Sequence, residues 1–159
     1  MLSRLEALEN YAGALGIILN DQILRKEDAL DGQYLEISGR YMILLNRHRP
    51  QKNRFVALAE EIGHHIRSTG NITELATVSQ RKSENAGKAW AIEFLLPLCK
   101  FAFATLLNRC KTTADYAEAL DYPEEFVAEA IAYHKRKGQW PASFEPFFPF
   151  MLKPGRDEE

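Results

Sequence analysis

Residues 54–68 constrain the fold most, because their apolar side chains recur at the spacing of an amphipathic helix. Apolar and polar side chains occupy different faces of that helix: Phe55, Ala59, Ile62 and Ile66 on one, and Glu60, Glu61, His64 and His65 on the other. Asn53 is suited to cap the first turn. Such a helix is stabilised by packing its apolar face, so the sequence predicts a folded domain in which one helix presents acid and imidazole groups.

The other hydrophobic patterns predict a small sheet and several further helices. Ser3 and Glu6 form a capping box, residues 38–40 form a turn, and residues 69–83 read as a polar loop. The expected strands are 17–19, 34–37 and 41–45, and the expected helices are 3–15, 54–68, 84–96, 101–108, 113–120 and 124–135. Pro97 ends the third helix. We therefore predict an α+β fold with a small mixed sheet or hairpin and a C-terminal helix-turn-helix-like unit.

Composition divides the chain into three segments. We expect a core at 1–98, a helical subdomain at 99–138 and a tail at 139–159. The tail holds four prolines and the aromatic residues Trp140, Phe144, Phe147, Phe148 and Phe150. A segment this apolar is expected to pack back on the domain or to meet a partner.

Charge and cysteine content exclude several classes of protein. Twenty basic and 22 acidic residues among 159 give a net charge of −2, so no global positive field favours nucleic acid. Cys99 and Cys110 form no Cys-x-x-Cys motif, which indicates unpaired thiols in a reducing compartment. The first 20 residues lack a signal-peptide pattern, and no stretch approaches the roughly 20 apolar residues of a membrane span. We predict a cytoplasmic protein with no membrane partner.

Glu60-Glu61-x-x-His64 is the motif that carries chemistry on the predicted helix. Side chains four residues apart converge on one ion from successive turns, which is why His-Glu-x-x-His binds zinc and supplies a glutamate as general base. Here a glutamate takes the place of the first histidine. The same spacing also gives an ordinary stabilising Glu–His pair on an exposed helix face, and Glu61 with His65 provides an alternative register.

Glu84 is a further candidate ligand, twenty residues after His64. On a helix it shares a face with small and apolar residues that allow another helix to approach, namely Gly87, Ala91 and Leu95. A carboxylate there can reach an ion held by the neighbouring helix, although the helix dipole alone also favours a glutamate in the first turn. The remaining histidines, His48 and His134, are expected at the surface.

Several motifs occur together in the order and spacing of one family. They are Gly39-x-Tyr41-x-Ile43-Leu44-Leu45-Asn46, Leu58-Ala59-Glu60-Glu61-Ile62-Gly63-His64-His65, Thr69-Gly70-Asn71-Ile72, Glu84 with Trp90-Ala91 and Leu95-Leu96-Pro97, and Glu124-Glu125-Phe126-Val127-x-x-Ala130-Ile131-x-Tyr133. Over residues 5–140 the chain resembles the ImmA/IrrE metallopeptidases, especially their phage and mobile-element branch. The resemblance implies a zincin-like core with active-site helices, bound Zn²⁺, and cleavage of a helix-turn-helix repressor.

Carried over by position, the resemblance makes His64 and Glu84 zinc ligands and Glu61 the general base. Glu60 stands where the family has its first histidine ligand, so the implied metal set is Glu60, His64 and Glu84. Gly87 replaces the usual alanine, a small-for-small change expected to disturb packing little.

Two alternatives remain open from the sequence. The first is a catalytically degenerate family member that acts as a protein-interaction module. The second reads residues 113–137 as a DNA-binding helix-turn-helix with phosphate contacts from 135–137. The sequence disfavours nucleic acid as a partner, however, because Glu124, Glu125 and Glu129 would repel the DNA backbone.

Overall fold

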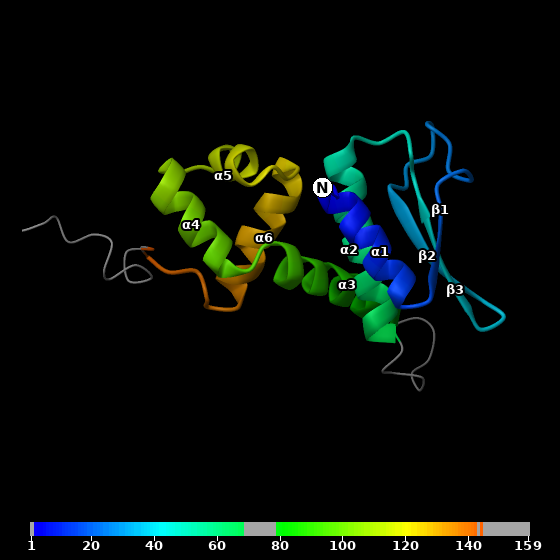
Figure 1. Cartoon of the computed structure of the whole chain (residues 1–159). Coiled ribbons are helices and arrows are strands. Elements are labelled where there is room, and N and C mark those ends of the chain that lie inside the picture. The colour runs from blue at the N-terminus through cyan, green and yellow to red at the C-terminus, as the bar shows by residue number, and fades with distance from the viewer. Residues whose placement is uncertain (1, 69–78, 143, 145–159) are drawn as a thin grey trace, which may run out of the picture. The chain divides into compact units, whose positions relative to one another are not determined.

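The computed structural model describes residues 2–68, 79–142 and 144, without the side chains of 68 and 79–84, and this part of the chain has six helices and a three-stranded sheet (Figure 1). The elements are α1 Arg4–Ala14, β1 Ile17–Asn20, β2 Gly32–Ile37, β3 Arg40–Leu45, α2 Gln51–Ser68, α3 Ser79–Leu95, α4 Leu98–Asn108, α5 Thr113–Leu120 and α6 Glu124–Arg136. The fold is α+β, as predicted. Two compact units divide the chain, an N-terminal unit Met1–Leu95 and a C-terminal unit Leu96–Glu159.

The sheet of the N-terminal unit is mixed, with strand order β1-β3-β2. β1 runs parallel to β3, whereas β2 pairs antiparallel with β3 and places Tyr34 opposite Ile43. The turn between β2 and β3 consists of Ser38 and Gly39, both with positive φ, which suits the twist of a two-residue hairpin. β2 therefore lies at an edge of the described sheet.

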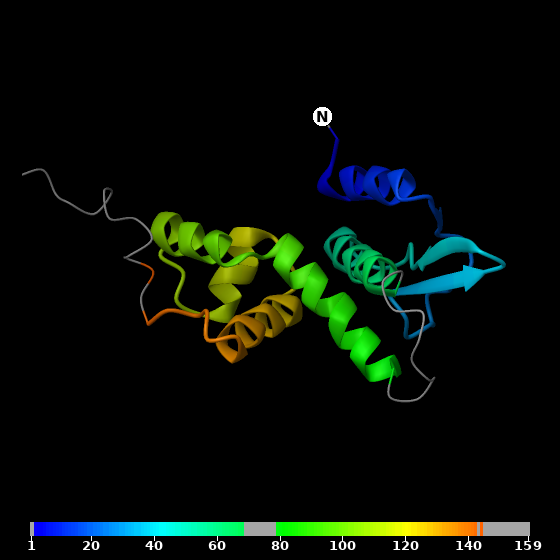
Figure 2. The ribbon, with the colours of Figure 1, turned by 90° about the horizontal axis from the view of Figure 1, so that it is seen from below.

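Helix α2 is the central element of the N-terminal unit. It packs against α1 and α3, which flank it in Figure 2, and also against β2 and β3. Leu58, Ala59 and Ile62 are completely buried along it. A helix with so many neighbours has little free surface, so most of its polar residues must also find partners inside the unit.

Three helices begin earlier than the sequence patterns predict. In α2, Pro50 O accepts hydrogen bonds from the backbone N–H groups of Asn53 and Arg54, so the helix starts at Gln51 and Asn53 is not its N-cap. α3 starts at Ser79, inside the expected loop, and the rest of that loop, 69–78, lies outside the described residues. α4 starts at Leu98, directly after Pro97, because proline ends one helix and suits the start of the next.

The C-terminal unit is built around α4, α5 and α6. Phe101 is fully buried and contacts the rings of Tyr116 and Trp140. α5 has a capping box from Thr112 and Asp115. In the described part of the tail, Phe144 packs on Trp140, so these aromatic residues fold back on their own unit.

The surface position expected for His134 is wrong. Its ring is buried, with Nε2 2.9 Å from the carbonyl oxygen of Leu96 and Nδ1 3.0 Å from Oε1 of Gln139. His48 is exposed, as predicted, and both cysteines are free. Among the described residues no single helix is long and apolar enough to cross a membrane, although Asn85–Leu95 and Leu98–Asn108 reach that length and composition together.

Candidate functional site

The polar side chains of α2 divide between two neighbours. Glu61 and His65 lie against the sheet and contact Tyr34 of β2, whereas His64 lies against Gly87 of α3. The single acid and imidazole face expected from the sequence is therefore split by tertiary packing.

Glu61 is held by the main chain of the edge strand. Its Oε2 accepts a 2.8 Å hydrogen bond from the backbone N–H of Tyr34, and its Cγ lies 3.1 Å from where a β-carbon on Gly32 would be. Burial, assisted by the charge of Glu60 and opposed by the hydrogen bond from Tyr34 N–H, raises the pKa of Glu61 to about 7. A carboxyl with this pKa exchanges a proton readily near neutral pH, as a general base must.

His65 is buried between two tyrosines. Its Nδ1 lies 3.1 Å from the hydroxyl of Tyr34, and its ring centroid lies 4.5 Å from that of Tyr41. Burial lowers the pKa of His65, partly opposed by the charge of Glu36, and burial also raises the pKa of Tyr34 to about 12. The phenol thus stays protonated, and its hydroxyl and Nδ1 of His65 share one hydrogen bond in which either group can be the donor, according to the tautomer of the imidazole.

His64 lies at the point where α2 and α3 approach most closely through glycine. A β-carbon on Gly87 would lie 2.8 Å from three atoms of the His64 ring, and one on Gly63 would lie 2.5 Å from the carbonyl oxygen of Gly87. The expectation that alanine and glycine are nearly equivalent at position 87 is therefore wrong for this chain. With alanine there, the His64 ring would have to move.

Glu60 and Glu84 complete the predicted metal set. Glu60 precedes His64 by one turn of α2 and is half-buried, like His64. Glu84 precedes Gly87 by one turn of α3, but its side chain lies outside the description. Among the described side chains, which do not include that of Glu84, no group of three His, Cys, Asp or Glu could hold a metal ion.

The chemistry of these donors fits a divalent metal. Zinc accepts imidazole nitrogen and carboxylate oxygen in its catalytic sites. The contact between His64 and Gly87 fixes the imidazole beside α3, the helix that carries Glu84.

Tyr34 is the functional residue that the sequence patterns miss. The only signal for it is the alternation of β2, which puts Gly32, Tyr34 and Glu36 on one face of the strand. Nothing in that alternation identifies α2 as the element facing the strand.

Comparison with protein-family models matches residues 19–132 to the Peptidase M78 family, the IrrE N-terminal-like domain. The match covers well over half of the chain, including all of α2 and α3. No curated protein and no solved structure matches the chain.

Proposed function

The chain belongs to the IrrE N-terminal-like family of metallopeptidases, and from this we propose that it is a zinc-dependent endopeptidase that cleaves a helix-turn-helix repressor of a prophage or mobile element. The observation that carries the proposal is Glu61, a carboxyl with a pKa of about 7 fixed by the main chain of an edge strand. A general base works best when its pKa lies close to the working pH, and the pKa of Glu61 lies in that range.

Glu60, His64 and Glu84 are the residues that would hold the metal. When bound, zinc polarises the scissile carbonyl and makes water more acidic. Glu61, next in sequence to Glu60, accepts the proton of the attacking water and returns it to the amine that leaves. Tyr34 N–H keeps Oε2 in place during both transfers, so the other carboxylate oxygen is available to the proton.

The substrate class is supported by the motifs that resemble the phage and mobile-element branch of the family. The net charge of −2 and the acidic start of α6 disfavour the DNA-binding alternative, since Glu124 and Glu125 are exposed there. A protein substrate fits the peptidase assignment directly.

The decisive experiment combines metal analysis with cleavage. Protein purified without chelator should contain about one zinc per chain, and it should cut the repressor encoded beside it at one bond, with the cut abolished by a chelator and restored by added zinc. A metal-free protein that binds this repressor without cutting it would instead support the alternative, a catalytically degenerate family member that acts as a protein-interaction module.

A further inference from the structure

Helix α2 and strand β2 lie side by side and make two contacts with nearly the same spacing. Glu61 of α2 lies against Gly32 of β2, and His65, one helical turn later, is hydrogen-bonded to the side chain of Tyr34, two strand residues later. Four helical residues advance about 6 Å, and two strand residues advance about 6.6 Å. The contact of Tyr34 with His65 therefore holds Glu61 in register with Gly32.

Gly32 is the residue of β2 over which the side chain of Glu61 passes. A β-carbon on Gly32 would lie 3.1 Å from Cγ of Glu61, and 3.5 Å from both Cβ of Ala57 and the carbonyl oxygen of Leu44. Nonbonded carbon atoms prefer a separation of about 3.5–4.0 Å, so only the contact with Glu61 would be too short. Ala57 is buried in α2 and the Leu44 oxygen belongs to the main chain of β3, so the glutamate side chain is the neighbour that would move.

The carboxylate of Glu61 ends at the open side of the same strand. Its Oε2 accepts the 2.8 Å hydrogen bond from the backbone N–H of Tyr34. The next residue, Leu35, pairs with Met42 and turns its N–H toward β3, because successive N–H groups of a strand point to opposite sides. Since Cγ of Glu61 is bonded to the carboxyl carbon, displacing Cγ would draw Oε2 away from Tyr34 N–H.

We propose that Gly32 is a positioning residue for Glu61: the missing side chain lets Glu61 cross the strand and reach Tyr34 N–H, which places the carboxylate for its reaction with water. This rests on the proposed function for what the placement achieves, whereas the placement itself involves neither metal nor substrate. A base held in the reactive geometry needs no further ordering, and a misplacement of about 1 Å can lower a rate by about 100-fold.

Hydrogen exchange at Tyr34 N–H, followed by NMR in the chelator-treated full chain, measures this placement directly. The parent is compared with Gly32→Ala and with Glu61→Ala, which lacks the carboxylate and gives the rate without the hydrogen bond. Leu35 N–H is the internal control, since it reports the pairing of β2 with β3. Gln33→Ala is the matched control variant, because Gln33 is exposed on the other face of β2.

In Gly32→Ala, Tyr34 N–H should exchange about tenfold faster than in the parent, the effect of losing one hydrogen bond, while Leu35 N–H keeps its rate. Gln33→Ala should match the parent at both amides. A Tyr34 rate in Gly32→Ala equal to that of the parent would overturn the proposal. Faster exchange at Leu35 as well would also overturn it, because the glycine would then be needed for the sheet rather than for Glu61.

Moving one methyl group from α2 to β2 tests the cause. The double variant Gly32→Ala, Ala57→Gly returns volume next to the new β-carbon, since Cβ of Ala57 lies 3.5 Å from it. This variant should bring the Tyr34 rate back to within about threefold of the parent, whereas Ala57→Gly alone should not change that rate relative to Leu35. A double variant that exchanges Tyr34 N–H as fast as Gly32→Ala would show that steric displacement of Glu61 is not the cause.

Cleavage kinetics connect the placement to the reaction. Zinc-loaded Gly32→Ala should have a kcat lower by about tenfold, with KM and zinc content close to those of the parent, because the proposed ligands Glu60, His64 and Glu84 are untouched. A change confined to KM, or a loss of zinc, would contradict a positioning role. If the parent itself cleaves no repressor, the proposed function fails, whereas the exchange rates at Tyr34 still decide whether Gly32 places Glu61.

Discussion

The ring of His64 occupies the space that a β-carbon on Gly87 would fill, 2.8 Å from that carbon's position. Close packing of imidazole on backbone joins the helix that carries Glu60 and Glu61 to the helix that carries Glu84. The glycines at this crossing therefore control the candidate site as well as the core.

Gly63→Ala should destabilise the protein by about 1–3 kcal/mol, the usual cost of overpacking, because the added carbon would meet the carbonyl oxygen of Gly87 at 2.5 Å. Gly13→Ala is the control, since Gly13 lies in α1 with no atom within 4 Å of the added carbon. It should stabilise by about 0.5–1 kcal/mol through helix propensity. Urea denaturation of both variants measures the difference, and equal midpoints would contradict the close crossing.

Glu61→Gln should abolish peptide cleavage while leaving the fold and the zinc content in place. The amide oxygen still accepts the hydrogen bond from Tyr34 N–H, but an amide takes no proton from water. Loss of general-base catalysis typically lowers the rate by about 10²–10⁴-fold. Cleavage rates and elemental analysis test this, and undiminished cleavage would assign the base to another residue.

The same variant should change how stability depends on pH in chelator-treated protein. The pKa of Glu61 is about 7 in the fold against 4.5 for the free side chain, so between these values the folded chain keeps a proton that the unfolded chain has lost. Raising the pH through this window therefore destabilises the parent protein but not Glu61→Gln. Between pH 4 and pH 8 the parent should therefore lose about 1–2 kcal/mol more stability than the variant, less than the full shift implies because the Glu61 side chain is only partly buried. If the free energies of unfolding of the two proteins changed with pH in parallel, the pKa of Glu61 would not be raised in the fold.

Tyr34→Phe should lower the free energy of unfolding by about 0.5–1.5 kcal/mol, since it removes the hydroxyl that is hydrogen-bonded to Nδ1 of His65. The hydrogen bond to Glu61 comes from the main chain and survives, so cleavage should fall little. Tyr41→Phe keeps the ring that packs on His65 and serves as the control in chemical denaturation. A large loss of cleavage in Tyr34→Phe would give the hydroxyl a direct role in the reaction.

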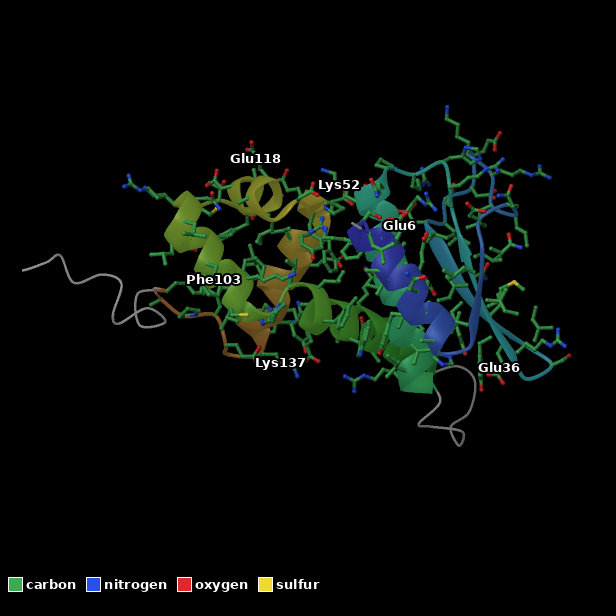
Figure 3. The ribbon with its side chains drawn as sticks, in the orientation of Figure 1. Glu6, Glu36, Lys52, Phe103, Glu118 and Lys137 are labelled. Carbon is green, nitrogen blue, oxygen red and sulfur yellow. The ribbon has the colours of Figure 1, made fainter. Side chains whose placement is uncertain are left out.

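Glu60→His should tighten zinc binding by at least about tenfold, because a neutral imidazole replaces one of two carboxylates and suits zinc better than harder ions. It should also make bound water more acidic and speed cleavage at neutral pH. Glu118→His is the control, because Glu118 is an exposed residue of α5 (Figure 3) and the change adds a histidine away from the candidate site. Competition with a chromophoric chelator measures both affinities, and an unchanged value for Glu60→His would mean that the motif register is wrong.

Helix positions were predictable where a capping residue marks the start. α1 begins directly after Ser3, whose predicted capping box with Glu6 is present, and α5 and α6 begin at the predicted residues 113 and 124. The starts of α2, α3 and α4 were placed too late, since their first turns carry polar or mixed residues without apolar periodicity. The spacing of apolar residues predicts the buried middle of a helix. It does not predict the turns at the end of the helix that extend beyond the core.

The candidate site was predictable on α2 alone. The spacing of Glu60, Glu61 and His64 placed them on one helix, and the structure agrees. The partners of these side chains come from tertiary packing: Tyr34 lies 27 residues before Glu61, and no local pattern links them. The predicted surface position of His134 was wrong for the same reason, because the buried ring has its hydrogen-bond partner in the carbonyl of Leu96, 38 residues earlier.

The edge position of β2 has a consequence for how the protein behaves in a crowded solution. An edge strand offers unpaired N–H groups to any extended chain that passes, which is how sheets recruit one another into aggregates. At Tyr34 that donor is already occupied by Glu61. The carboxyl proposed to act on a peptide bond therefore also closes one point of attachment along the open side of the sheet.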